Sequence, residues 1–433
     1  MKWSSCLGLV LVFAAAIGLA GCGFSGPTVS GDIPSIFSKQ QAEKQKTDVD
    51  VYWDATYSMQ GYTTIPEGNV YRSLPDNLED IGNSMGQVKF FRFGETVQPL
   101  EGRDHRKFSD PSAYNETITA IHTVLDTADT SHLSIIVTDL FESDADWSNV
   151  AQKVKEKYFA NHLAAAIIGI KNPFNGDIFD VGFSGEAKKF NYNSGNDPAR
   201  YRPFYLLVLG QEDQVRDFIQ RCKAKKSGDN DMRFLLLSEN LMDNPADLSS
   251  MEIKDSKNIF GDEKLKLKDK RMKEFGIDKV GEPAHLVTSF QYKPAEDGCN
   301  VDVHKLAPKV EVKVLKDGEW QKPEADGDCK LTIEPDPAQA GMFTMDLSFT
   351  PEKSLDSGQV NLVYATVAPG PEGISLPDWV KQWNMENVSG MTAQQFDGSK
   401  TINFSHLVES LKDSALSAAQ PIMANMALVI SYE

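Results

Sequence analysis

The sequence is poor in the residues on which zinc proteins and many enzymes rely. Its 433 residues include only five cysteines and seven histidines. No Cys-x-x-Cys motif occurs, and the histidines are scattered without the spacing of metal ligands, so zinc chemistry has no support. A glycine-rich phosphate-binding loop is also missing, which counts against phosphate chemistry.

Positive charge and long apolar runs are scarce as well. The chain has 44 lysines and arginines against 62 aspartates and glutamates, a formal net charge of −18. This balance argues against nucleic acid as a partner and against binding of anionic lipid by the protein body. Beyond the N-terminus, no segment approaches the length of a membrane-spanning helix. Hydrophobic residues make up 41% and charged residues 24% of the chain, which is typical of folded proteins, and the length suits two or three domains.

The extreme N-terminus does contain an apolar run. Lys2 precedes the apolar residues 7–19, and the string Leu-Ala-Gly-Cys22 closes the run. This segment resembles the signal peptide and lipobox of bacterial lipoproteins, and the run is too short for a standard spanning helix. The resemblance implies a signal peptide over 1–21, lipid attachment to the Cys22 thiol, and anchoring to the extracytoplasmic face of a bacterial membrane. Residues 22–46 are polar and predict a lipidated tether.

The remaining cysteines suggest a disulfide. Cys6 would leave with the signal peptide and Cys22 would carry lipid, which leaves three cysteines in the folded body. Cys299 and Cys329 both lie in turns rich in aspartate and glycine, and in an oxidising compartment we expect them to form a disulfide. Cys222 lies on the apolar face of a predicted helix, where a small buried core residue is the favoured interpretation.

Strands and helices alternate over residues 47–225. Short apolar runs that are typical of buried strands occupy 49–54, 88–93, 133–140, 164–170 and 204–209. Segments with helical spacing of apolar residues lie between them, at 75–85, 114–126, 145–159 and 211–222. This alternation predicts an α/β domain with a doubly wound, mainly parallel sheet covered by helices on both faces. The long connection 171–202 has no helical pattern and predicts a surface β-hairpin or a functional flap.

The second half of the chain has a different pattern of charged and apolar residues. Residues 226–280 are crowded with charge and are interpreted as a connecting region. Residues 281–433 alternate apolar and polar side chains between turn-rich spacers, which predicts a mainly β, sandwich-like domain with a helical insertion. Trp379 and Trp383 stand one helical turn apart in that insertion. The pair can grip a sugar ring, but packing against the sandwich is the favoured interpretation.

The most informative motif is Asp54-Ala-Thr56-Tyr-Ser58, at the end of the first predicted strand. Thr138 and Asp139 follow another apolar strand, and the carboxyl ends of parallel strands meet at one edge of a sheet. Carboxylate and hydroxyl oxygens suit a hard divalent cation, so the pattern predicts a Mg²⁺ or Mn²⁺ site. The alternative is a plain strand end and turn, because Asp, Ser and Thr favour such positions by bonding nearby backbone.

This arrangement resembles the metal-ion-dependent adhesion site of von Willebrand factor type A (VWA) domains. The usual pattern is Asp-x-Ser-x-Ser, a distant Thr and an Asp after a buried strand, and the resemblance covers residues 45 to 225. Position by position it implies these ligands: Asp54, Thr56, Ser58 and Asp139, with Thr117 or Thr119 in place of the middle Thr. Thr56 stands where the pattern usually has Ser, and its hydroxyl can also bind a cation. The Gly-Gly that usually precedes the middle Thr is absent.

The resemblance implies a function in binding. An incompletely coordinated cation offers a position to an acidic side chain of a protein partner, so we expect a membrane-anchored, non-enzymatic binding lipoprotein. Two other functions stay open. One is a metal-dependent hydrolase of the phosphoesterase type with Asp54 as nucleophile, although no Asp-x-Asp-x-Thr motif occurs there and no His base is evident. The other is a metal-free assembly scaffold.

Overall fold

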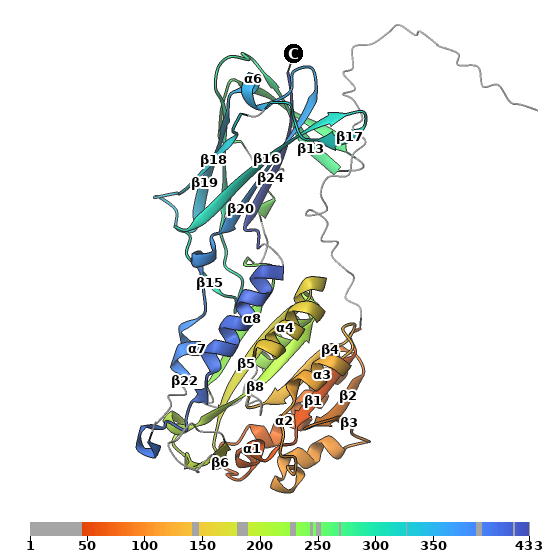
Figure 1. Cartoon of the computed structure of the whole chain (residues 1–433), viewed down its shortest axis with the longest axis vertical. Coiled ribbons are helices and arrows are strands. Elements are labelled where there is room, and N and C mark those ends of the chain that lie inside the picture. The colour runs from red at the N-terminus through yellow and green to blue at the C-terminus, as the bar shows by residue number, and fades with distance from the viewer. Residues whose placement is uncertain are drawn as a thin grey trace, which may run out of the picture.

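The computed structural model describes most of the chain from residue 46 onward. The described ranges are 46–140, 147–179, 189–225, 231–242, 246–247, 253–267, 270–325, 327–386, 392–418 and 421–432. The predicted signal peptide, the tether up to residue 45 and Cys22 lie outside these ranges. Figure 1 shows two parts, a sheet with helices, called the α/β body below, and a part built mainly of strands, called the β body.

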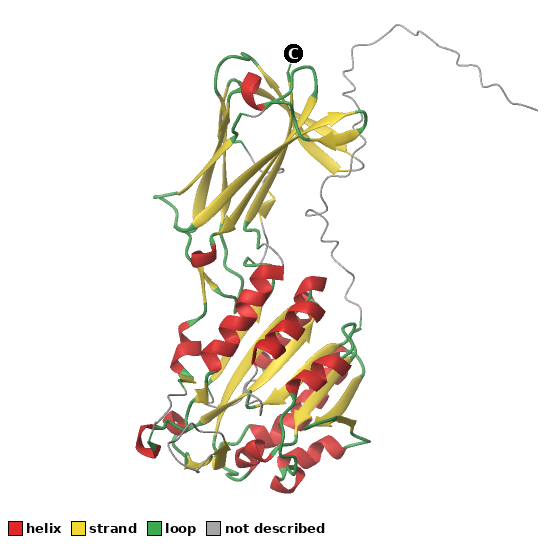
Figure 2. Ribbon diagram, viewed as in Figure 1, coloured by secondary structure: helices red, strands yellow, loops and turns green. Residues whose placement is uncertain are grey.

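The α/β body is a seven-stranded sheet between two layers of helices (Figures 1 and 2). In spatial order its strands are β3 (Val97–Pro99), β2 (Val88–Phe93), β1 (Val49–Asp54), β4 (Leu133–Thr138), β8 (Arg202–Gly210), β5 (Ala164–Asn172) and β9 (Met232–Leu237). Two helices pack on one face, α2 (Leu74–Met85) and α5 (Glu212–Ala224), and two on the other, α3 (Ile121–Thr127) and α4 (Trp147–Lys157). Strands β1, β4 and β8 are buried along their whole length because helices cover both faces.

The prediction of a doubly wound, mainly parallel sheet is wrong. Among the described strands of this sheet, only β1 pairs in parallel, with β2 and with β4, whereas the pairs β2–β3, β4–β8, β8–β5 and β5–β9 are antiparallel. The described part of the connection between β5 and β8 forms the hairpin β6 (Asn175–Phe179) and β7 (Lys189–Asn193) and contains no α-helix. Since a parallel return needs a crossover, β8 runs in the opposite direction and inserts between β4 and β5. An apolar run marks a buried strand but does not encode its direction.

The β body consists of two sheets packed face to face. One contains β12 (Ile259–Leu267), β13 (Lys270–Ile277), β24 (Ala424–Ser431), β20 (Val360–Pro369), β16 (Leu306–Lys316) and β17 (Glu319–Gln321), with β10 (Ala246–Asp247) beside β24. The other contains β11 (Asp255–Lys257), β14 (Ala284–Gln291), β19 (Met342–Phe349) and β18 (Lys330–Pro335). Side chains of β14, β19, β20 and β24 share one hydrophobic core. Residues 226–280 therefore supply β9 to the α/β body and β10 to β13 to the β body.

Two helices from the second half of the chain return to the α/β body. The chain leaves β20, forms α7 (Asp378–Gln382) and α8 (Phe404–Ala418), and re-enters the β body as β24. Helix α8 packs against α4, and both returning helices share a core with β5 and β8. Other short elements include α6 (Pro351–Ser354) and the strand pairs β15 (Asn300–Val301) with β21 (Ile374–Ser375) and β22 (Asn384–Met385) with β23 (Thr401–Ile402).

The tryptophan pair of the insertion packs against the α/β body and not against the β body. Trp379 and Trp383 are only 7% and 3% exposed and belong to the core that α7 and α8 share with the first sheet. Gly169 of β5 makes room for this contact, because a Cβ there would lie 2.6 Å from the Trp383 ring. Neither indole is free to stack on a sugar.

The three cysteines of the described chain are free. Cys299 is buried in the core that contains α7 and α8, whereas Cys329 packs against the core of the β body. The predicted disulfide between them is therefore wrong, because the two thiols belong to different cores. Cys222 is buried on α5. Among the described residues, no helix combines the length and the apolar character needed to cross a membrane.

Candidate metal centre

The candidate ligands come together because β1 and β4 are parallel neighbours. Their register places Asp54 and Thr138, the last residues of the two strands, side by side. Asp139 follows at the same edge of the sheet, and the short helix α1 (Tyr57–Gln60) begins just after Thr56 and carries Ser58. The parallel part of the sheet thus brings the two sequence motifs to one rim.

Asp54 accepts three hydrogen bonds within this rim. Thr56 donates its backbone N–H to Oδ1 at 3.0 Å and its hydroxyl to the same oxygen at 2.7 Å. The Thr138 hydroxyl donates to Oδ2 at 2.9 Å. The hydroxyls of Thr56 and Ser58 lie 3.1 Å apart. The carboxylate is therefore held in one orientation, with hydroxyl groups beside both of its oxygens.

The segment 114–120 closes the cluster from another side. Two of its backbone N–H groups donate to the carbonyl of Ala55, at 3.0 and 3.1 Å. The buried Thr119 donates its hydroxyl to Thr56 Oγ1 at 3.2 Å, whereas Thr117 is exposed. The structure therefore brings Thr119, and not Thr117, to the cluster. The sequence contains a signal for this choice, because Thr119 directly precedes the apolar residues that lead into α3.

The oxygen spacing of the cluster is that of ordinary hydrogen bonds and is also compatible with the ligands of a small, hard cation. Neighbouring ligands of an octahedral Mg²⁺ with bonds of about 2 Å are separated by about 3 Å. The oxygen pairs Asp54–Thr56, Thr56–Ser58 and Thr56–Thr119 are separated by 2.7, 3.1 and 3.2 Å. All of these donors are oxygens, and Asp139 adds a second carboxylate at the same rim. The donor set therefore suits Mg²⁺ or Mn²⁺ and not zinc.

Burial alters the ionisation of Asp54. The side chain is fully buried, and burial together with the charge of Asp139 raises its pKa from 3.8 to about 7. The hydrogen bonds from Thr56 and Thr138 favour the ionised form but are outweighed. A divalent cation would reverse the balance, since a nearby positive charge stabilises a carboxylate. A proton and a cation would therefore compete for Asp54.

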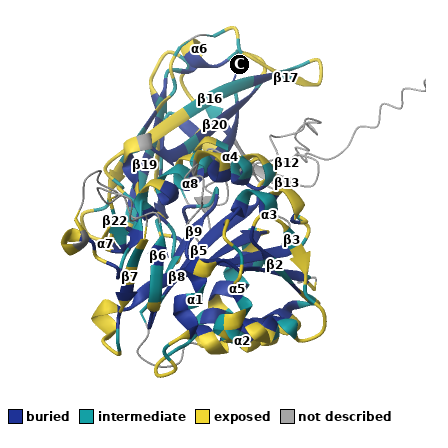
Figure 3. Ribbon diagram, turned by 60° about the horizontal axis from the view of Figure 1, so that its bottom comes forward, coloured by how far each residue is buried: buried dark blue, intermediate teal, exposed yellow. Residues whose placement is uncertain are grey.

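The outer side of the cluster is covered by other parts of the chain. Phe179 of β6 and Thr401 of β23 line a small cavity together with Ser58 and Asp139. The cavity volume is about 10 Å³, which is the room that one water molecule needs. Figure 3 shows the central strands of the first sheet, among them β5 and β8, as buried. A cavity of this volume is too small to hold a side chain from a partner.

A buried arginine completes the wall of this cavity. Arg202, the first residue of β8, is 3% exposed, and its Nη1 donates to the carbonyls of Gly398 and Lys400 at 3.2 and 2.7 Å. The guanidinium carbon lies 5.7 Å from the centre of the Phe174 ring. Sequence analysis missed Arg202, because its partners lie almost at the other end of the chain.

A second group of acidic residues lies beside α2. Ligand atoms of Asp76, Glu79 and His105 lie within 4.8 Å of one another. Arg106 already contacts both carboxylates, at 2.9 Å each. Because one guanidinium already pairs with both carboxylates, we interpret this group as an ion-pair network and assign no metal to it.

A serine motif on α2 does not form a hydrolase site. Residues 82–86, Gly-Asn-Ser84-Met-Gly, have the spacing of the nucleophile elbow, which requires a serine on a sharp turn between a strand and a helix. Ser84 instead lies in the last turn of α2 and donates to the carbonyl of Ile81 at 2.6 Å.

Comparison with known proteins does not identify a family. The chain matches no family model, and no curated protein matches it. The interpretation of the site therefore depends on its geometry and its chemistry.

Proposed function

We propose that this protein is a membrane-anchored bacterial lipoprotein that binds a protein partner through a divalent cation and has no enzymatic activity. Asp54, Thr56, Ser58, Thr119 and Asp139 would hold Mg²⁺ or Mn²⁺. The main support is the single rim at which β1 and β4 deliver two aspartates beside three hydroxyls with the spacing of cation ligands.

The proposed membrane anchor is supported by the N-terminal sequence. The apolar run and Cys22 resemble a lipoprotein signal, so the chain would be held at the extracytoplasmic face by acyl chains. The acidic body would then project from the membrane surface without binding to anionic lipid.

The partner would supply an acidic side chain to the open position of the cation. Arg202 lines the same cavity as Asp139 and would pair with an incoming carboxylate. Since the cavity has the volume of about one water molecule, the β6–β7 hairpin or the segment 398–402 must shift before a carboxylate enters. We therefore expect slow association, limited by this shift.

Thermal unfolding of the full-length chain tests the cation site. Excess Mg²⁺ or Mn²⁺ should raise the unfolding temperature relative to EDTA, because a ligand that binds the native state stabilises it. Asp54→Ala and Asp139→Ala should abolish this rise. Glu79→Gln, in the ion-pair network beside α2, is the matched control and should retain it. An unchanged unfolding temperature in the parent chain would rule out the cation site and favour a metal-free scaffold.

Two matched peptide libraries test partner binding. One library carries a fixed central Asp, and its twin carries Asn at that position. Fluorescence anisotropy should detect binding of the Asp library alone, and only with Mg²⁺ present. Hydrolysis of phosphate esters that is lost in Asp54→Ala would contradict a non-enzymatic function.

A further inference from the structure

The free edge of the first sheet presents backbone groups that point away from the sheet. Strand β9 is the last strand of the sheet and pairs with β5. The Lys171 N–H donates to the carbonyl of Asp231, so the odd-numbered residues of β9 are those bonded to β5. The backbone N–H and C=O groups of Met232, Phe234 and Leu236 therefore face outward.

The chain itself covers only part of this edge. The Leu236 N–H donates to the carbonyl of Asp297 at 2.7 Å, so the turn at 295–298 lies against one end of the edge. Within the described ranges, no hydrogen bond reaches the outward groups of Met232 and Phe234. An added strand would satisfy these groups, since an open edge is a template for pairing with another chain.

A groove of about 560 Å³ lies beside the open part of the edge. This volume falls within the range of about 300 to 1,000 Å³ that is typical of ligand sites. Besides Met232 and Phe234, the groove is lined by Tyr292, Pro294 and the small exposed part of Trp379.

The charged residues of the groove are already neutralised. Arg233 pairs with Asp231 at 2.8 Å, and Asp297 pairs with Lys223 at 2.6 Å. The groove therefore combines outward-facing backbone groups, an aromatic side chain and compensated charge, which fits an extended and apolar segment.

We propose that this groove binds an extended segment of a partner protein, which adds to β9 as a further strand and places an apolar side chain against Tyr292. Backbone hydrogen bonds to Met232 and Phe234 would supply affinity, and Tyr292 would select the side chain. This surface is separate from the cation cluster, which lies at the ends of β1 and β4 in the middle of the sheet. Binding here is therefore independent of Mg²⁺.

Peptide selection supplies the probe for this proposal. Linear peptides are selected from a random library on the full-length chain in EDTA, and their affinity is measured by fluorescence anisotropy. Met232→Pro removes an outward N–H at the first residue of an edge strand, where proline is tolerated, and should weaken binding about tenfold. Met232→Ala keeps that N–H and should bind like the parent chain.

Amide hydrogen exchange of the unsubstituted chain gives a second readout that does not depend on folding of a variant. Peptide binding should slow the amides of Met232 and Phe234 and leave Arg233 and Leu235 unchanged, because the latter are already bonded to β5. The proposal is overturned by a selection that yields no binder, by binders that leave the two outward amides unprotected, or by equal affinity for Met232→Pro. Amides of Met232 and Phe234 that exchange slowly in the free chain would also overturn it, since the edge would then be occupied already.

Discussion

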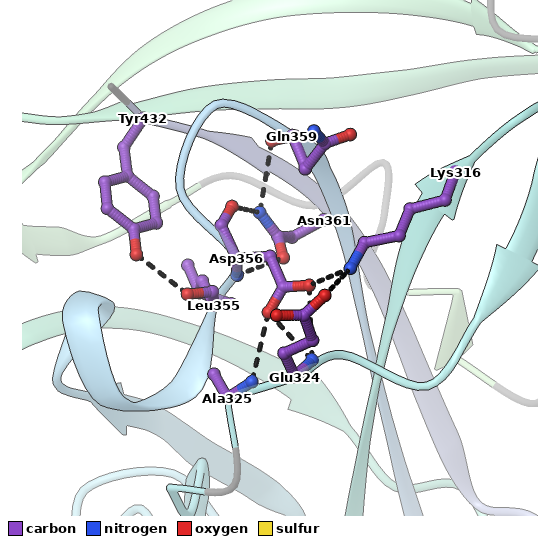
Figure 4. A network of polar contacts seen from close by, with 8 residues as sticks. All are labelled: Lys316, Glu324, Ala325, Leu355, Asp356, Gln359, Asn361 and Tyr432. Atoms are coloured by element: carbon purple, nitrogen blue, oxygen red, sulfur yellow. Dashed lines mark hydrogen bonds and ion pairs between the residues drawn. The ribbon is translucent and has the colours of Figure 1, made fainter.

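Two aspartates with little solvent access have opposite electrostatic surroundings. Asp356 of the β body accepts the backbone N–H groups of Glu324 and Ala325 at 2.9 and 3.1 Å and pairs with Lys316 at 3.0 Å (Figure 4). Burial works to raise the pKa of Asp356, but these donors outweigh it and hold the pKa below its usual value. The charge of Asp356 is therefore neutralised by the chain itself.

Asp54 has hydroxyl groups where Asp356 has a lysine. Among the residues that the structure describes, Asp54 forms no ion pair, and burial with the charge of Asp139 raises its pKa to about 7. The contrast suggests two roles for a shielded carboxylate. A carboxylate whose charge the chain neutralises, such as Asp356, fixes a loop. A carboxylate surrounded by hydroxyls and a second carboxylate, such as Asp54, can instead be neutralised by a cation from solution.

The largest effect is expected at Asn361, which ties the Asp356 loop to the sheet (Figure 4). Its fully buried side chain accepts from the Asp356 N–H at 2.9 Å and donates to the Asp356 carbonyl at 3.0 Å. Asn361→Ala should cost about 3 kcal/mol of unfolding free energy, because buried backbone groups lose their partners. Urea denaturation measures the change, with Gln359→Ala, an exposed side chain on the same turn, as the control. Equal stability of the two variants would show that the network is dispensable.

The same substitution at the two aspartates should separate stability from cation binding. Asp356→Asn should lose about 1 kcal/mol whether Mg²⁺ or EDTA is present, because its donors then face a neutral acceptor. Asp54→Asn should keep its stability in EDTA, since a carboxyl with a pKa of about 7 is partly protonated near neutral pH, and should lose the response to Mg²⁺. Denaturation of both variants with and without the metal checks this. A response to Mg²⁺ that survives in Asp54→Asn would place the cation elsewhere.

The pH dependence should differ in sign between the two aspartates. The folded-state pKa of Asp54, about 7, exceeds the unfolded value of 3.8, so the folded state binds more protons and this group lowers stability as pH rises from about 4 to 7. The lowered pKa of Asp356 adds stability at neutral pH, which is lost as the pH falls through the acidic range. The rise in unfolding temperature caused by Mg²⁺ should therefore be larger at pH 8 than at pH 5.5. Calorimetry at pH 8 and at pH 5.5 measures the rise in unfolding temperature. A larger rise at pH 5.5 would refute competition between proton and cation.

The smallest effect is expected from a pair of threonines. Thr119→Val removes a hydroxyl that lies 3.2 Å from Thr56 Oγ1 and should weaken Mn²⁺ binding severalfold. Thr117→Val, two residues away and exposed, should change nothing. Calorimetric titration with Mn²⁺ compares the two variants. Weaker Mn²⁺ binding by Thr117→Val than by Thr119→Val would indicate that Thr117, and not Thr119, is the ligand.

The part of the site on consecutive residues could be predicted from sequence. Asp54 and Asp139 each follow a mainly apolar segment, and these segments become the buried strands β1 and β4, although β1 also contains the buried Asp50. Thr119 was harder to choose, because two threonines in one loop have the same chemistry and only the packing of the following helix distinguishes them. Arg202 had no local signal, since the carbonyls it bonds belong to Gly398 and Lys400.

The pattern of apolar residues in the sequence did not predict strand direction or long-range packing. The runs at 164–170 and 204–209 become buried strands, but their antiparallel pairing follows from a hairpin connection. Trp379 and Trp383 have the spacing of a helix face, which predicts burial but does not name the surface that buries them.

The return of α7 and α8 makes the α/β body depend on the far end of the chain. A chain that ends before residue 404 contains β1 to β9, but β5 and β8 then lack part of their cover. The uncovered apolar face is a surface on which truncated chains can associate. We therefore expect a chain truncated before residue 404 to aggregate instead of giving a free α/β body.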